Sequence, residues 1–178
     1  MRGWTAAILA AALLLPAAAQ AAAEIRIVAL GASNTYGSGR GSHRGGVSPS
    51  LAYPAQLQRL LRARGFAASV RNAGVPGDTT GGMLARLNSA VPKGTSIVIL
   101  DPGGNDARRG LAGTTAGNIE AIRQRLAARG IKLIVISRLG RIAPRDTLLP
   151  DRQHFNARGH AAIAAYLVPL VMEAARAE

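Results

Sequence analysis

The sequence predicts an α/β domain, a three-layer α/β/α sandwich in which helices cover both faces of a short parallel sheet. Short runs rich in Ile and Val alternate with amphipathic stretches along the chain, which is the pattern of repeated β-α-β units. Residues 96–100 end in four consecutive apolar side chains, as expected of a strand that is covered on both faces. Right-handed crossovers between such strands would place the helices in two layers.

Four segments are predicted to be strands, and each is a short, largely apolar run in which β-branched residues are frequent. They are residues 25–30, 67–70, 96–100 and 131–137. Neither an internal repeat nor a linker interrupts the alternation of strands and helices. Residues 24–178 are therefore predicted to form one domain.

Four segments are predicted to be helices, because apolar residues recur in them at helical spacing. They are residues 51–64, 83–88, 118–129 and 157–175. Gly65 and Gly130 follow two of these helices, and glycine favours the left-handed conformation found at a helix C-terminus. Asn156 is placed to cap the last helix.

The first 23 residues have the pattern of a cleavable secretory signal. Arg2 gives a positive start, residues 6–15 form an apolar core and Pro16 breaks it. Residues 19–21 and 21–23 both have the small-x-small pattern of a cleavage site. The alternative is an uncleaved anchor, but the apolar core is shorter than the roughly 20 residues that span a bilayer. We therefore expect a periplasmic or secreted protein. Because the chain has no cysteine, its stability must come from packing and backbone hydrogen bonds.

The net charge of +13 raises the question of an anionic partner. A nucleic acid is one candidate, but the arginines are spread along the predicted helices and aromatic residues make up only 3% of the chain. We therefore expect a solvated, arginine-rich surface without specific nucleic-acid binding. Weak contact with anionic membranes or envelope polymers is the interaction that such a surface favours.

Four short polar segments are not required by the hydrophobic pattern. Residues 31–34, 77–79 and 103–106 each follow a predicted strand, and residues 151–154 precede the last helix. In an open α/β sheet, ligands bind at the carboxyl ends of the strands, near the point where the strand order reverses. We therefore expect these segments to meet at one edge of the sheet.

The first three segments each offer one residue suited to acyl-transfer chemistry. Ser33, just after the tight turn that Gly31 permits, is either a nucleophile or an ordinary helix N-cap. Gly77 lets a substrate approach the backbone, or simply closes a strand-to-helix turn. Asn105 can donate to a developing oxyanion, or occupy a left-handed turn position.

The fourth segment has the spacing Asp151-x-x-His154. A carboxylate at this spacing can reach Nδ1 of its own histidine and leave Nε2 facing a serine, although both side chains could instead make ordinary polar contacts. His160 is the competing base, but it lies inside the predicted helix without a carboxylate at matching spacing. His43 lies in a loop rich in Gly and Ser, residues 37–50. We expect His154 to be the base.

In their order and spacing, the four segments resemble the SGNH (GDSL-type) hydrolase family over nearly the whole mature chain. The resemblance implies a flavodoxin-like SGNH hydrolase fold, no metal and no cofactor. It also implies a site in which Ser33 is the nucleophile, His154 the base and Asp151 its orienting carboxylate, with Ser33, Gly77 and Asn105 as oxyanion-hole donors. One departure is Ala32, which stands where the family motif Gly-Asp-Ser-Leu has its Asp.

The resemblance implies a serine esterase that hydrolyses ester or thioester bonds of small acyl or lipid-like substrates. The sequence Gly104-Asn105-Asp106, followed by Arg109-Gly110, is most similar to the small periplasmic thioesterase and lysophospholipase branch. Because few residues separate Ser137 from Asp151, we expect short acyl groups to be preferred. The alternatives are a deacetylase of envelope polysaccharide and a non-catalytic, cationic envelope-binding protein on the same scaffold.

Overall fold

The computed structural model describes residues 24–38 and 46–176, so the predicted signal segment and His43 lie outside the described residues. One sheet of four parallel strands has the order β2-β1-β3-β4. The strands are β1 (Ile25–Gly31), β2 (Ala68–Gly74), β3 (Ile97–Leu100) and β4 (Lys132–Val135). The chain moves from β1 to β2 on one side and then to β3 on the other side. The strand order therefore reverses between β1 and β3, which is where ligands bind in such sheets.

Seven α-helices and four short 3₁₀ turns connect or follow these strands within the described residues. The helices are α1 (Ser33–Tyr36), α2 (Tyr53–Arg62), α3 (Thr80–Ala85), α4 (Leu87–Ala90), α5 (Asn105–Arg108), α6 (Thr115–Ala127) and α7 (Ala157–Arg176). The 3₁₀ turns are Pro49–Leu51, Ala112–Thr114, Leu139–Arg141 and Arg145–Thr147.

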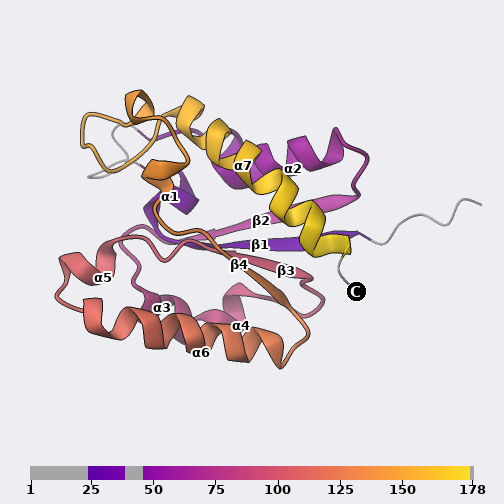
Figure 1. Cartoon of the computed structure of the whole chain (residues 1–178), viewed down its shortest axis with the longest axis horizontal. Helices are drawn as coiled ribbons and strands as arrows, with labels where there is room; N and C mark the ends of the chain where they lie inside the picture. Colours follow the sequence, from indigo (N-terminus) through magenta and orange to yellow (C-terminus); the bar gives the residue numbers. More distant parts are fainter. Residues whose placement is uncertain (1–23, 39–45, 177–178) are drawn as a thin grey trace, which may run out of the picture.

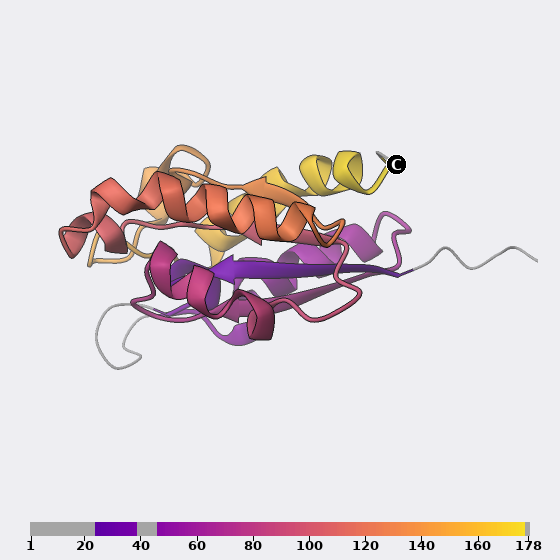
Figure 2. The ribbon, with the colours of Figure 1, turned by 90° about the horizontal axis from the view of Figure 1, so that it is seen from below.

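The two faces of the sheet pack against different helices (Figure 1). On β1, Ile27 and Ala29 face the core formed with α2 and α7. Val28 and Leu30 face the opposite core, formed with α3, α4 and α6, and Figure 2 shows these three helices from their own side. Because successive side chains of a strand point to opposite faces, the alternation builds a core on each side. The predicted three-layer fold is confirmed.

The second strand is longer than the sequence predicts. β2 extends to Gly74 because its parallel register with β1 continues as far as the pair Gly31–Gly74. Arg71 and Asn72, which follow the predicted segment, belong to this strand and are exposed. β2 lies at an edge of the sheet, where polar and charged side chains are common.

The helical segment predicted at residues 83–88 is instead two short helices. α3 begins earlier, at Thr80, because the Thr79 side chain caps it by accepting a hydrogen bond from the Gly82 amide at 3.1 Å. The helix breaks at Arg86, whose guanidinium donates to Asp78 Oδ2 at 2.7 Å and to the Gly31 carbonyl at 3.1 Å. The break therefore comes at a residue that ties this layer to the end of β1.

Between β4 and residue 176, where the described part of the chain ends, no further strand joins the sheet. Residues 139–147 form two 3₁₀ turns, and an isolated antiparallel bridge joins Leu148 to Phe155 before α7 begins. As predicted, Asn156 caps α7: its side-chain oxygen accepts from the amides of Arg158 and Gly159. No helix in the described ranges is long and apolar enough to cross a membrane.

Candidate active site

Two short helices, α1 and α5, lie beyond the same end of the sheet (Figure 1). Each begins just after a strand that borders the reversal of strand order, α1 after β1 and α5 after β3. Close packing of α1 requires glycine at the ends of β1 and β2. A Cβ on Gly31 would lie 2.1 Å from Thr35 Oγ1, and one on Gly74 would lie 2.3 Å from the amide nitrogen of Tyr36. These glycines therefore set the position of Ser33, the first residue of α1.

Ser33, His154 and Asp151 form one hydrogen-bonded chain. Ser33 Oγ lies 2.7 Å from His154 Nε2, and His154 Nδ1 lies 2.6 Å from Asp151 Oδ2. A carboxylate at Nδ1 favours the tautomer with the proton on Nδ1, which leaves Nε2 to accept the serine proton. The Ser33 and His154 side chains come from positions 121 residues apart.

The Asp151 carboxylate also shapes the loop that presents the histidine. Its Oδ1 accepts hydrogen bonds from the amides of Gln153 and His154, both at 3.0 Å. Burial alone would raise the pKa of Asp151, but these amides and the His154 ring outweigh it and hold the pKa well below its ordinary value. The same loop is tied to α1, because Asn34 Nδ2 donates to the Gln153 carbonyl at 3.2 Å.

Asn105 is buried, and its side chain is fixed from both ends. Its Nδ2 donates to the Asp78 carbonyl at 2.6 Å, and its Oδ1 accepts from Arg108 Nη2, also at 2.6 Å. A side-chain amide has two N–H groups, so one remains for another acceptor. Asn105 lines the same cavity as Ser33 and His154.

Gly77 lies in a tight turn that precedes α3. The Asp78 amide donates to the Val75 carbonyl at 3.0 Å, and Gly77 has φ 78°. With Pro76 before it, this is the pattern of a type II turn, in which glycine is favoured at the third position. The Gly77 carbonyl accepts from Arg109 at 2.7 Å. Unlike Asn105, Gly77 is not among the described residues that line the cavity.

Asp106 orders the loops around Asn105. Its carboxylate accepts hydrogen bonds from the Thr80 amide at 2.9 Å, from the Thr80 hydroxyl and from the Thr115 hydroxyl at 2.7 Å. Burial would raise the pKa of Asp106, but these hydrogen bonds outweigh it and lower the pKa. The starts of α3, α5 and α6 are thereby joined beside the site.

The cavity beside Ser33 has a volume of about 480 Å³. Its lining combines the polar residues described above with apolar and cationic side chains. The lining residues that sequence reasoning did not single out include Pro102, Arg108, Arg138, Leu139, Leu148, Arg152 and Phe155. Pro102 stands just after β3, so the rule that ligands bind at strand carboxyl ends could have pointed to it. The residues of the turn after β4 and of the loop before α7 have no such signal.

Asp101 is a buried carboxylic acid in the wall of this cavity. Burial raises its pKa to about 6, although hydrogen bonds from the Gly103 amide and the Thr35 hydroxyl oppose the shift. Thr35 also shares a hydrogen bond with the Tyr53 hydroxyl at 3.2 Å. The Tyr53 pKa is raised by burial and by the nearby Asp101 carboxylate.

His160, the competing base in the sequence, has a structural role in this arrangement. Its Nδ1 accepts from the Tyr53 amide at 3.2 Å, and the two rings are stacked with centroids 6.4 Å apart. The amide at the start of a helix has no partner within the helix, so His160 of α7 supplies one to α2. Burial, together with a smaller contribution from the nearby His154, lowers the pKa of His160 to about 4.

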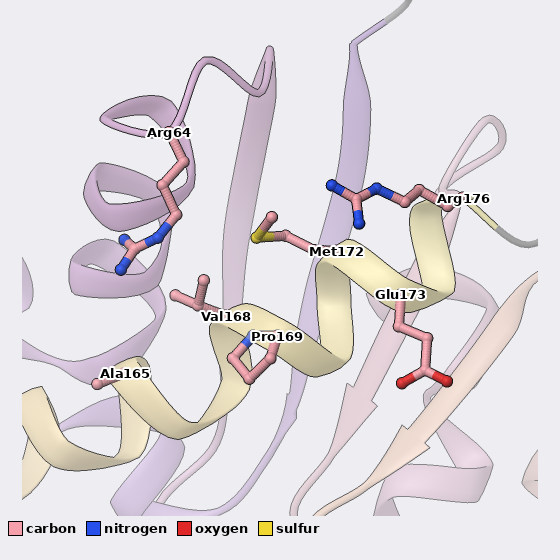
Figure 3. A pocket seen from close by; sticks show the side chains of 7 residues that line it. All are labelled: Arg64, Ala165, Val168, Pro169, Met172, Glu173 and Arg176. Carbon is pink, nitrogen blue, oxygen red and sulfur yellow. The ribbon is translucent and has the colours of Figure 1, made fainter.

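A second hollow, of about 620 Å³, lies against α7 and contains no candidate catalytic residue (Figure 3). Its lining includes Arg64, Met172 and Pro169, the proline within α7. Among residues 24–38 and 46–176, no group of three or more His, Cys, Asp or Glu side chains could hold a metal ion.

The chain also resembles known proteins in sequence. Residues 29–172 match the model of the GDSL-like lipase/acylhydrolase family. The chain belongs to this family. The match covers most of the chain, so the predicted SGNH-type acyl hydrolase is confirmed at the level of the family.

Individual relatives agree with the family match. The chain is 33% identical over 93 residues to the esterase TesA of Pseudomonas aeruginosa, and the match covers 51% of this chain and 46% of that protein. The crystal structure of AlinE4, an SGNH-hydrolase family esterase, is similar with a TM-score of 0.63 and 26% identity, over 87% of this chain and 98% of AlinE4. The crystal structure of TesA has a TM-score of 0.64 and 22% identity, over 85% of this chain and 98% of TesA.

Proposed function

We propose that the chain is a serine esterase in which Ser33 is the nucleophile, His154 the general base and Asp151 the orienting carboxylate. The observation that carries the proposal is the continuous chain from Ser33 Oγ through both ring nitrogens of His154 to Asp151, with distances of 2.7 and 2.6 Å. The alternative role of Ser33 as a helix N-cap does not fit α1, because the N-cap of this helix is Ala32 and Ser33 is its first residue.

In the first step Ser33 Oγ attacks the acyl carbon while His154 Nε2 takes its proton. The same nitrogen then returns the proton to the departing alcohol or thiol. Water attacks the acyl-enzyme by the same route and restores the serine. Asp151 stays ionised throughout, because its hydrogen bonds keep its pKa low, and it stabilises the imidazolium that forms twice per cycle.

The oxyanion would be bound by the Ser33 amide and the free N–H of Asn105 Nδ2, which both belong to residues that line the cavity. Gly77 does not line it, but it precedes Asp78, whose carbonyl accepts from Asn105, and its amide would be the third donor. Ser33 is the first residue of α1, and amides at that position have no acceptor within the helix. The hydrogen bonds from Arg108 and to Asp78 fix the Asn105 amide plane before substrate binds. Removal of one such donor costs about 10²–10³ in turnover, so Asn105→Ala should lose that much.

The test of the proposal is labelling by a fluorophosphonate probe together with hydrolysis of p-nitrophenyl butyrate. The wild type should be labelled on Ser33, and Ser33→Ala should lose both labelling and hydrolysis while its circular dichroism spectrum is unchanged. Ser38→Ala removes a serine hydroxyl elsewhere in the same region and is the matched control. Retention of more than about a tenth of the turnover by Ser33→Ala would rule out the assignment, because loss of a nucleophile costs about 10⁶-fold.

We propose small carboxylic esters or thioesters as the substrates and a periplasmic or secreted location for the enzyme. The support for the location is the signal-like pattern of residues 1–23. N-terminal sequencing of the chain recovered from the periplasm or medium would test it, with a start near residue 24 as the expected result.

A further inference from the structure

Three arginines line the cavity that contains Ser33, outside the proposed catalytic set. Arg108 is the last residue of α5, Arg138 follows β4, and Arg152 lies next to Asp151 in the loop before α7. All three are exposed. They come from three different segments of the chain, so their convergence on one cavity is a product of the fold and not of a local run of charge.

The charge of these arginines is not balanced within the cavity. Among the described residues that line the cavity, Asp101 is the only carboxylic acid, and it is buried. Arg108 donates to the side-chain oxygen of Asn105, a neutral group. Arg138 and Arg152 form no ion pair with a carboxylate in the part of the chain that the structure describes. Their guanidinium groups therefore keep their donors for an anion from solvent.

Arg138 and Arg152 also share an unusual backbone conformation. In the ranges 24–38 and 46–176 they are the two non-glycine residues with positive φ, at 60° and 57°. A residue with a Cβ is strained in this conformation, whereas glycine or asparagine adopts it more readily. Arginine is abundant in this chain, but its abundance does not explain why both strained positions are occupied by arginines that line this cavity. A requirement for the two guanidinium side chains at these positions explains it.

The remaining lining adds an apolar surface. Leu139, Leu148 and Phe155 line the same cavity of about 480 Å³. The cavity thus offers apolar side chains and guanidinium groups around one serine. An ester with a short apolar part and a negatively charged group matches both.

We propose that this cavity selects esters that bear a phosphate or carboxylate group close to the scissile bond, and that Arg138 and Arg152 bind that group. The inference rests on the proposed function, since it concerns the substrate of the same serine. Both anions accept paired hydrogen bonds from a guanidinium. The reaction is ordinary hydrolysis: water adds across the ester, the C–O bond to the alcohol breaks, and the anionic group stays on the fragment that carried it.

The test uses two matched pairs of substrates that differ in charge. Monobutyrin and butyryl glycerol phosphate place the charge on the alcohol side. The methyl ester and the free acid of p-nitrophenyl glutarate place it on the acyl side. For each pair the measured quantity is the ratio of kcat/KM for the charged ester to kcat/KM for the neutral one, which cancels any general loss of activity.

The wild type should prefer the charged member of at least one pair. In Arg138→Asn/Arg152→Asn that ratio should fall about tenfold, as expected for the loss of two exposed charge contacts. Asparagine suits the left-handed conformation, so the variant should fold. Arg138→Lys/Arg152→Lys keeps the charges and should retain most of the preference. Arg141→Gln removes an exposed arginine of the same loop that does not line the cavity, and its ratio should stay within about twofold of wild type.

The dependence of this kcat/KM ratio on salt concentration is a second readout. Exposed charges are screened over about 10 Å at 0.1 M salt and about 3 Å at 1 M, so the wild-type ratio should fall with salt and that of the asparagine variant should not. A wild-type ratio near one in both pairs, with Ser33 labelled and neutral esters hydrolysed, would overturn this inference and leave the proposed function standing. Absence of both labelling and hydrolysis would refute the proposed function and the inference with it.

Discussion

Asp101 makes the stability of the fold depend on pH in a direction opposite to most carboxylates. Its pKa is raised from the ordinary value of 3.8 to about 6, mainly by burial. Between these values the folded protein holds the proton more tightly than the unfolded chain does. The stability present below pH 4 is therefore lost as the pH rises through about 6. Since one pKa unit corresponds to about 1.4 kcal/mol, the total loss is about 3 kcal/mol.

Asp101→Asn should remove this loss while keeping the local hydrogen bonds. The amide oxygen can still accept from the Gly103 amide. The amide nitrogen can donate to Thr35 Oγ1, which in turn can donate to the Tyr53 hydroxyl. We therefore expect the stability difference between variant and wild type to grow in favour of the variant by about 2 kcal/mol between pH 4.5 and pH 7.5.

The assay is urea unfolding of both proteins at the two pH values, with the free energy of unfolding taken from the linear extrapolation. Because the variant and the wild type are compared at the same pH, the contributions of other titrating groups to stability cancel, including that of His160. The pKa of His160 is lowered to about 4, so stability is lost as the pH falls from about 6.5 through 4. Equal differences at pH 4.5 and pH 7.5 would show that Asp101 does not titrate as its burial requires.

Four further predictions follow from the site and its surroundings. His154→Ala should reduce turnover by about 10⁶-fold and Asp151→Asn by about 10⁴-fold, because a misoriented base is still present; equal losses in steady-state assays would contradict these roles. His160→Phe should keep the ring stacking but leave the Tyr53 amide without its acceptor. The free energy of unfolding, measured by urea titration, should therefore fall by about 1–3 kcal/mol. Turnover per folded molecule should be retained, and its loss would show that His160 takes part in catalysis. In a series of p-nitrophenyl esters from acetyl to palmitoyl, kcat/KM should not rise beyond butyryl, and a rise beyond octanoyl would overturn the expected preference for short acyl groups. Binding to vesicles with anionic lipid should fall steeply as salt is raised, whereas equal binding to neutral vesicles would exclude an electrostatic origin.

The sequence predicted the layers of the fold because apolar periodicity records burial directly. The run ending at Leu100 is buried on both faces, and the predicted helix 157–175 coincides with α7 to within a residue. The predicted helix boundaries were less accurate where a side-chain hydrogen bond determines where a helix begins or ends. α3 begins where the Thr79 side chain caps it, and it ends at Arg86, whose guanidinium donates to Asp78 and to the Gly31 carbonyl.

The proposed catalytic residues could be identified from the sequence because each stands at a fixed place relative to a strand or helix end. The structure brings Ser33, Asp151 and His154 into hydrogen-bonding distance, although their catalytic roles stay a prediction. Arg138 and Arg152 could not be assigned to the cavity in this way. Their positions depend on irregular segments, the turn after β4 and the loop before α7, for which local patterns give no direction in space.

The separation of 121 residues between Ser33 and His154 has a consequence for the timing of activity. Ser33 leaves the ribosome with the first strand-to-helix turn of the sheet, whereas His154 emerges only after the residues between them have been made. The loop that presents His154 is held by the bridge from Leu148 to Phe155 and leads directly into α7. If Ser33 and His154 are the proposed nucleophile and base, a chain that lacks the His154 loop contains an ordinary, unreactive serine hydroxyl. Under that proposal, hydrolysis begins only after the first and last elements of the domain have packed together, and esterase activity would report the completion of folding.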